Sequence, residues 1–366
     1  MKFSVDRESL LKPIQQVSGV VERRQALPIL QNLLLEIKRG RLLITGTDLE
    51  VELKTNVEVS AEEEGLVTVP ARKLLDICRE IPEKAEINFS LDQNRLELRS
   101  GRFRSTLSTL PAEDFPTFDD SEANLIVEAD AKEFKLLLDK TSFAMAHQDV
   151  RFFLNGMLIE SGQNFLRAVA TDGHRLALSN IQQAGLNEKE VQVIVPRKAV
   201  LELQRLLPEL AGSVKIEFSQ SNLKVLSENY TFATKLVDGK FPDYQRVIPK
   251  EGSKIVMAEK DELRQALNRT SILSNEKFRG IRLNLTNAQL QLSANNPEQE
   301  EAEESVSVNY EGAELQIGFN VSYLQDVLSV IDNKKVKITL HDPNSSAILE
   351  DPDADQFLYV VMPMKL

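Results

Sequence analysis

The chain has 366 residues and a mass of 41.2 kDa, which is too large for one ordinary hydrophobic core and suits two or three domains. Its hydrophobic content of 42% excludes a disordered chain, and its net charge of −12 argues against wrapping nucleic acid with the whole surface. No run of about 20 apolar residues occurs, and Met1–Asp6 lacks an apolar signal segment, so we expect a cytoplasmic protein. The single cysteine, Cys78, excludes an internal disulfide and a multi-cysteine metal site, and we expect no metal and no cofactor.

One sequence pattern occurs three times along the chain. Val69–Leu75 is echoed by Val195–Leu201, 126 residues later, and Phe115-Pro116 by Phe241-Pro242 at the same distance. Phe319-Asn320 takes the corresponding place in a third copy. A period of this length indicates a tandem of domains rather than a solenoid. We predict three similar domains at 1–122, 123–250 and 251–366.

Each copy repeats one order of elements: a helix, two or three strands, a second helix and more strands. Leu10, Ile14 and Val17 follow Asp6 at helical spacing, and Pro13 inside that segment costs helix stability. Second helices are predicted near 71–81, 197–208 and 321–331, and alternating apolar residues predict strands such as 86–91, 215–218 and 336–340. Two helices and about eight strands per copy predict an α+β fold, with two helices packed on antiparallel sheets in each domain.

Basic residues recur on the predicted helices although the protein is acidic. Arg72, Lys73 and Arg79 share one side of a second helix, and Arg197, Lys198 and Arg205 do the same in the next copy. For one helix alone, a solvated face is the simpler interpretation. Recurrence at equivalent positions favours a local basic surface, and we predict that Arg72 and Lys73 contact DNA.

Acidic and basic residues gather at opposite ends of the chain. The acidic run lies in the third copy, and a basic strand with Leu107 lies in the first. Such a chain can associate head to tail, and a rotation that closes produces a ring. The predicted dimer interface contains Lys73, Arg95, Arg102, Arg104, Leu107, Ile272, Leu273, Glu298, Glu300, Glu301, Glu303 and Glu304.

The segment Thr171–Ala177 has the composition of an active site. A hydrolase could use Asp172 and His174 as an acid–base pair, with Ser179 or Thr171 as nucleophile. HExxH, GxSxG and P-loop patterns are absent from the sequence, so no further motif supports catalysis. The equivalent segment of the first copy, Thr47–Glu50, has no histidine, which favours a shared structural feature at a strand end.

Several segments together resemble one family, the bacterial β sliding clamps, which are the processivity subunits of DNA polymerase III. The segments are Leu27–Leu30, Ala146–Arg151, Thr171–Leu176, Lys235–Gly239, Ser274–Gly280, Ala294–Glu304 and Val361–Leu366. The resemblance covers essentially the whole chain in order. It implies a non-catalytic homodimeric ring of six domains, with helices lining a hole through which double-stranded DNA passes. It also implies a clamp loader that opens the ring, and a replicative polymerase and other proteins that bind through short peptides.

The resemblance also assigns roles to individual residues. By position, Arg24, Gln148, Arg197 and Lys198 correspond to residues that touch DNA. The peptide-binding pocket corresponds to Leu154, Thr171, Gly173, His174, Arg175, Leu176, Pro242, Arg246, Val247, Phe278, Asn320, Tyr323, Ser346, Val360, Met362, Pro363, Met364 and Leu366. An adaptor that binds proteins without forming a ring is the alternative that remains beside the hydrolase.

Overall fold

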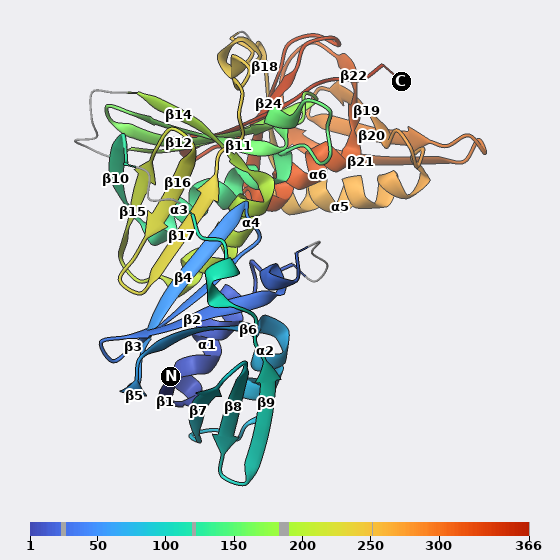
Figure 1. Cartoon of the computed structure of the whole chain (residues 1–366). Helices are drawn as coiled ribbons and strands as arrows, with labels where there is room; N and C mark the ends of the chain where they lie inside the picture. The colour runs from blue at the N-terminus through green and yellow to red at the C-terminus, as the bar shows by residue number, and fades with distance from the viewer. Residues whose placement is uncertain (23–26, 119–121, 183–189, 251, 366) are drawn as a thin grey trace. The chain divides into compact units, whose positions relative to one another are not determined.

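The computed structural model describes residues 1–22, 27–118, 122–182, 190–250 and 252–365, and the chain falls into two compact units (Figure 1). The first unit contains Met1–Lys135 and Lys198–Leu236, and the second contains Leu136–Arg197 and Val237–Leu366. The central sequence copy is divided between the two units, so the boundaries of the three domains remain a prediction.

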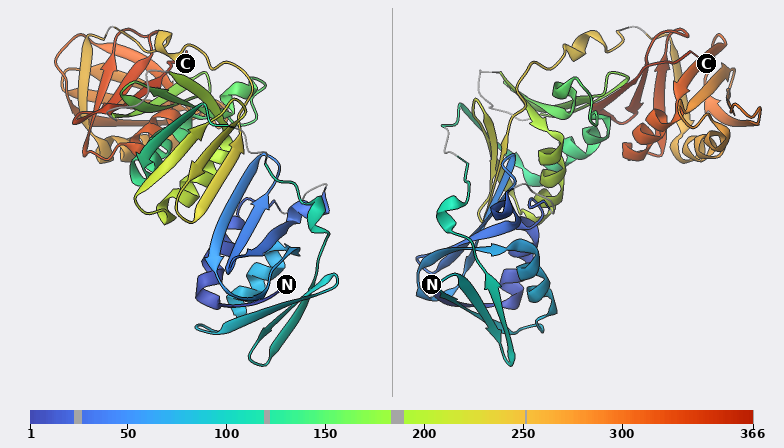
Figure 2. Two further views of the ribbon diagram at one scale, coloured as in Figure 1. Left: turned by 60° about the vertical axis from the view of Figure 1, so that its left-hand side comes forward. Right: turned by 45° about the vertical axis from the view of Figure 1, so that its right-hand side comes forward.

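The first unit is built on two antiparallel sheets. Their strand orders are β10-β15-β16-β17-β4-β3-β2-β6 and β5-β1-β7-β8-β9. Helix α1 contacts β3 and β4 of the larger sheet and β1 of the smaller one, and it also packs against α2 (Figure 2). The elements are β1 (Lys2–Asp6), α1 (Arg7–Val17), β2 (Asn32–Lys38), β3 (Arg41–Thr47), β4 (Val51–Glu58), β5 (Ser60–Glu63), β6 (Gly65–Pro70), α2 (Ala71–Glu80), β7 (Glu86–Asp92), β8 (Arg95–Ser100), β9 (Phe103–Ser108), β10 (Leu125–Asp130), β15 (Ser213–Phe218), β16 (Asn222–Leu226) and β17 (Tyr230–Lys235).

The second unit contains one antiparallel sheet of twelve strands. Its order is β14-β11-β12-β13-β25-β24-β23-β18-β21-β20-β19-β22. Helices α5 and α6 pack against each other, and α5 lies on β20 and β21 (Figure 1). The elements are β11 (Gly156–Gly162), β12 (Phe165–Thr171), β13 (Arg175–Gln182), β14 (Val191–Pro196), β18 (Lys254–Glu259), α5 (Lys260–Thr270), β19 (Gly280–Thr286), β20 (Gln289–Asn295), β21 (Glu301–Asn309), β22 (Leu315–Asn320), α6 (Val321–Val330), β23 (Lys335–Leu340), β24 (Ala347–Asp351) and β25 (Ala354–Val361).

The helices form where the apolar spacing predicts them. The second helices are α2, α4 (Arg197–Leu206) and α6, and each ends within two residues of its predicted end. The first helix of the central copy is α3 (Ala131–Thr141). Leu10, Ile14 and Val17 are buried along α1, which continues through Pro13. Asp130 begins α3 by accepting hydrogen bonds from the backbone N–H groups of the next turn, as a helix cap does. No helix of the described residues is long and apolar enough to cross a membrane.

The sheets continue across the expected domain boundaries. Strand β17 pairs with β4, and Phe232 lies opposite Leu53. Strand β13 pairs with β25, and Leu176 lies opposite Val360. The second pairing brings residues of the central copy beside the carboxyl-terminal strand, and it builds the site described below.

The only cysteine is protected by its place in α2. Cys78 is fully buried, and burial raises the pKa of its thiol to about 12. About one thiol in ten thousand is then ionised at pH 8. Because the thiolate is the reactive form, we expect the folded protein to resist Ellman's reagent at pH 8. In guanidinium chloride one thiol per chain should react within minutes, and rapid reaction of one thiol in native buffer would contradict this placement.

Candidate functional site

The segment between β12 and β13 is a tight turn rather than a strand. The Thr171 hydroxyl donates to the Arg175 carbonyl at 2.6 Å and accepts from the Gly173 N–H at 3.0 Å. The Asp172 carboxylate accepts from the backbone N–H groups of His174 at 2.9 Å and Arg175 at 3.1 Å. Gly173 has a φ of +88°, which glycine adopts without a steric cost. Asp172 and His174 therefore lie in a turn and not on a strand.

The first copy contains the same turn. Thr47 donates to the carbonyl of Val51 at 2.8 Å and accepts from the N–H of Leu49 at 3.1 Å. Asp48 accepts from the N–H groups of Glu50 and Val51 at 2.9 and 2.7 Å. The Thr-Asp pair thus closes a turn at a strand end in both copies. This confirms the interpretation of the pair as a shared structural feature.

The Arg175 guanidinium binds structural partners through all three of its nitrogens. Its Nε donates to Asp172 at 3.1 Å, its Nη2 donates to the Phe143 carbonyl at 2.7 Å, and its Nη1 pairs with Asp326 of α6. Its guanidinium also lies over the rings of Phe143 and Tyr323, at 5.3 and 4.6 Å from their centroids. Since the side chain is only 11% exposed, Arg175 holds the turn against α6 and has little capacity for a ligand.

A largely apolar cavity of about 250 Å³ opens beside this turn. The Leu176 and Val360 side chains are buried at its floor, and Val247 and Met362 are exposed at its rim. Ten of the predicted pocket residues line it: Leu154, Thr171, Gly173, Arg175, Leu176, Pro242, Val247, Ser346, Val360 and Met362. Four lining residues were not predicted: Arg151, Phe153, Asp243 and Tyr244. A small apolar cavity with polar groups at its edge suits an apolar side chain of a ligand.

Tyr244, one of the four unpredicted residues, is fixed from behind the cavity. Its hydroxyl donates to buried Glu160 at 2.8 Å and accepts from Arg167 at 2.8 Å. Gln192 donates to the other oxygen of Glu160 at 2.6 Å. Burial, followed by the bond to Glu160, raises the pKa of Tyr244. The ring therefore forms a rigid wall, and no local sequence pattern could have indicated it, because its partners lie 77 and 84 residues away.

Four further residues of the predicted pocket do not line the cavity and make other contacts. His174 stacks on Tyr323 with centroids 6.5 Å apart. Asn320 caps α6 by accepting from the Ser322 N–H, and exposed Arg246 pairs with Asp243 at 2.8 Å. Leu366 lies outside the described residues.

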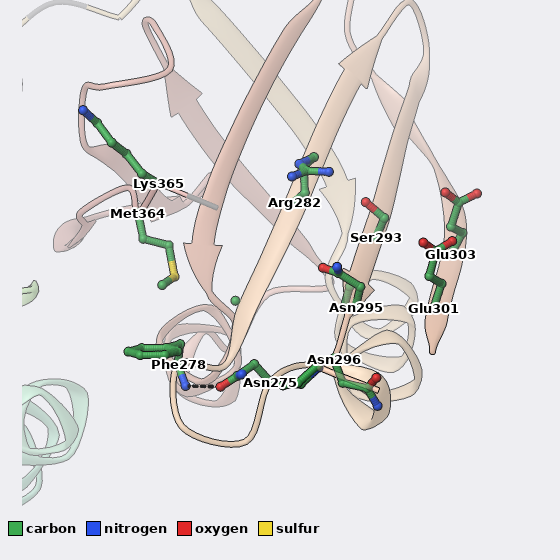
Figure 3. Close-up of a pocket in the computed structure, with 13 residues that line it drawn as sticks. Asn275, Phe278, Arg282, Ser293, Asn295, Asn296, Glu301, Glu303, Met364 and Lys365 are labelled. Atoms are coloured by element: carbon green, nitrogen blue, oxygen red, sulfur yellow. Dashed lines mark hydrogen bonds between the residues drawn. The ribbon is translucent and has the colours of Figure 1, made fainter. Parts of the chain in front are cut away.

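The end of the chain runs from the cavity to a second groove. The Met362 N–H donates to the His174 carbonyl at 2.9 Å, and after Pro363 the Met364 N–H donates to the Gly318 carbonyl at 2.8 Å. Met364 and Phe278 line the second groove rather than the cavity (Figure 3).

The residues predicted to contact DNA differ in their availability. Arg72 and Lys73 are exposed on α2 of the first unit, although Asp76 lies 3.8 Å from Arg72. Lys198, also in the first unit, forms ion pairs with Glu22 and Asp48. Its ammonium is already neutralised, so it is less available to a phosphate than its sequence position suggested.

In the second unit, Gln148 is exposed and the Arg197 guanidinium donates to the Met145 carbonyl at 3.3 Å. Arg24 lies outside the described residues.

The predicted interface residues form one group in each unit. Arg95, Arg102 and Arg104 are exposed on and beside β8 and β9, but Arg104 already pairs with Glu97 of its own sheet. Leu107 is only 6% exposed and has little surface to offer a partner.

In the second unit, Ile272 is 75% exposed and Leu273 is half-buried. Glu298, Glu300, Glu301 and Glu303 are exposed, while Glu304 accepts a hydrogen bond from Arg269 at 2.9 Å.

The fold and the site together define a class of protein: repeated α+β domains with antiparallel sheets and a small apolar cavity for part of a ligand, as in DNA clamps. Models of the DNA polymerase III beta subunit match the chain in order: the N-terminal domain at residues 1–119, the central domain at 128–243 and the C-terminal domain at 245–365. The chain therefore belongs to the family of DNA polymerase III beta subunits, the beta sliding clamps.

Individual relatives agree over the full length. The beta sliding clamp of Pseudomonas putida is 54% identical, with 100% of each chain covered. The crystal structure of the DNA polymerase III subunit beta from Pseudomonas aeruginosa is 52% identical, with a TM-score of 0.98 and 100% of each chain covered. A second Pseudomonas aeruginosa structure, a sliding clamp bound to griselimycin, is 53% identical, again with a TM-score of 0.98 and full coverage of both chains.

Replacing Arg175 tests its structural role. Arg175→Leu leaves the carboxylates of Asp172 and Asp326 without their cation, and we expect a loss of about 3 kcal/mol in the free energy of unfolding. Urea denaturation followed by circular dichroism measures the change. Arg246→Leu is the matched control, because its exposed side chain should change stability by less than about 0.5 kcal/mol. Equal stability of the two variants would contradict the structural role.

Proposed function

We propose that two copies of this chain join head to tail in a closed ring around duplex DNA. The ring tethers the replicative polymerase by binding a short peptide segment of the polymerase. The observation that carries the proposal is the full-length match, in order, to the three domains of the beta subunit. We propose domain boundaries at 1–122, 123–250 and 251–366. A protein that acts with a replicative polymerase meets its DNA in the bacterial cytoplasm, where we place this chain.

The charge distribution supports retention by topology rather than by tight binding. The net charge is −12, and of the basic residues proposed to face DNA, Lys198 is paired internally. Each phosphate contact strengthens binding and makes it dependent on salt. A ring with few free cations can encircle the duplex and still slide. Arg72, Lys73, Gln148, Arg197 and the partly paired Lys198 are the proposed contacts, together with Arg24.

The apolar cavity is the proposed peptide site. Rigid apolar walls around Leu176 and Val360 suit a buried anchor residue, and unbranched Met362 at the rim can repack for different partners. Griselimycin bound to the Pseudomonas aeruginosa clamp supports a peptide-like ligand for this family.

The geometry argues against an acid–base pair at Asp172 and His174. The Asp172 carboxylate is occupied by the backbone of its own turn and by Arg175, and the Ser179 hydroxyl is buried. A general base must reach the proton that it removes. We therefore propose a platform that binds other proteins and has no catalytic activity of its own.

Closed and linear DNA distinguish a ring from the adaptor alternative. The labelled protein, loaded by a clamp loader onto a nicked circular plasmid, should stay with the plasmid during gel filtration at 0.5 M NaCl. Cutting the plasmid once should release most of it, because a sliding ring leaves at free ends, whereas high salt has already weakened phosphate contacts. Equal retention on circular and linear DNA would exclude topological linkage.

A charge in the cavity tests the peptide site. Val247→Asp places a carboxylate at an apolar rim, and we expect the Kd for griselimycin to rise at least about tenfold, which is about 1.4 kcal/mol. Isothermal titration calorimetry measures it. Ile255→Asp is the matched control, because Ile255 is 51% exposed and Val247 53%, and Ile255 does not line the cavity. An unchanged Kd in Val247→Asp would refute the pocket assignment.

A further inference from the structure

A second groove, of about 620 Å³, lies in the third copy on the face of the sheet opposite to α5. Figure 3 shows the residues that line it. Strands β19, β20 and β21 form its floor. Arg282 lies opposite Ser293, which lies opposite Glu303, so the three side chains form one row across the strands. Asn295 and Glu301 form a neighbouring row on the same face. The floor is therefore polar, in contrast to the apolar cavity.

Arg282 is an available cation on that floor. Its side chain is exposed, and among the described residues no ion pair with it is formed. Arg151 and Arg269, in the same unit, pair with Asp149 and Glu304. An exposed guanidinium with five donors is suited to a carboxylate. Lys365 adds a second exposed cation on the side of the groove nearer to Met364 (Figure 3).

The apolar rim of the groove is held in a fixed position. The Asn275 side chain accepts from the N–H group of Phe278 at 3.0 Å (Figure 3). It also accepts from the N–H group of Lys277 at 3.0 Å. This turn presents the Phe278 ring although the residue is 56% exposed. Met364, on the same rim, is tied to Gly318 through its backbone. Because the backbone of this turn is already fixed, little backbone entropy is lost when a ligand covers the exposed ring.

The groove continues the proposed peptide site. Met362 lines the cavity and Met364, two residues later, lines the groove. We propose that the groove binds, in extended form, the segment that flanks a docked peptide, and that an acidic side chain of this segment meets Arg282. This inference rests on the proposed function, because the flank is delivered by an anchor in the cavity.

The dimensions and charges define the segment further. Strands lie about 4.8 Å apart, so the path from β22 to β21 is roughly 14 Å, or about four extended residues. Arg282 and Lys365 lie nearer to Met364 along this path than Glu301 and Glu303, which belong to the predicted dimer interface (Figure 3). A flank that fits therefore has its acidic residues next to the anchor and ends with a neutral residue before these glutamates.

Matched peptides test the proposal. Four fluorescent synthetic peptides share one Leu-Phe anchor and carry a four-residue flank at one end of it or the other. Counted from the anchor, the first and third residues of the flank are both Glu or both Gln, and the second and fourth are Ser. In one orientation, we expect the Glu peptide to bind about threefold to fivefold more tightly in fluorescence anisotropy, as for an exposed ion pair. Arg282→Gln should remove this advantage, and 0.5 M NaCl should weaken it. Arg264→Gln on α5 is the control and should keep it.

The outcomes separate the two proposals. If griselimycin fails to displace the shared anchor, the peptide site itself is refuted. If the anchor is displaced but the Glu and Gln peptides bind equally in both orientations, the groove proposal fails and the cavity stands. If Arg282→Gln changes the sedimentation of the dimer and leaves both peptide affinities unchanged, a second copy of the chain covers the groove, and the proposal is overturned.

Discussion

The pairing of β13 with β25 is the constraint on which the site depends. Leu176 lies opposite Val360 in that pairing, although 184 residues separate them in the chain. Backbone hydrogen bonds fix this register, since a slip of one residue would turn every side chain to the opposite face. The two floor residues of the cavity are therefore held side by side by the sheet itself. The same pairing carries Met362 to the His174 carbonyl and so directs the end of the chain toward the second groove.

The Arg175 guanidinium adds a second, polar connection at the same place. It joins the turn after β12 to Asp326 of α6 and to the Phe143 carbonyl. A nearly buried cation with two carboxylates is stable only if its hydrogen-bonding groups are satisfied, and here each described partner is close and directed. Asp172 and Arg175, which first suggested catalysis, therefore use their polar groups to hold the turn beside the cavity. The chemistry of the site lies in the apolar surface that these polar residues support.

The elements could be predicted from the sequence because their signals are local. The spacing of Leu10, Ile14 and Val17 specifies one face of a helix, and the repeat of Thr47-Asp48 at Thr171-Asp172 specifies a turn. The cavity could not be predicted in this way. Its ten expected residues followed from the family resemblance, and Tyr244 was missed because its hydroxyl is held by partners in other strands.

Contacts with distant parts of the chain are what the sequence patterns could not show. The helical position of Lys198 indicated a free cation, but Asp48 lies 150 residues away in sequence and neutralises it. Leu107 was predicted at an interface because it ends a basic strand, and the alternation of β9 places its side chain on the covered face of that strand. Sequence patterns report which face of an element a residue occupies. They do not report which distant element covers that face.

The small size of the cavity explains why a second binding surface is useful to such a protein. A cavity of about 250 Å³ encloses roughly the anchor side chains of a short peptide. Burial of apolar area contributes about 25 cal/mol per Å² to the free energy of binding. The entropy lost on association and ordering opposes this gain, so a single anchor binds with moderate affinity. Peptides with similar anchors therefore have similar affinities. Charges outside the cavity can distinguish one partner from another. Because each exposed ion pair is weak, they slow the dissociation of a bound partner only a little. Arg282 and Lys365 offer that kind of discrimination: the shared anchor admits many partners, and the flank ranks them.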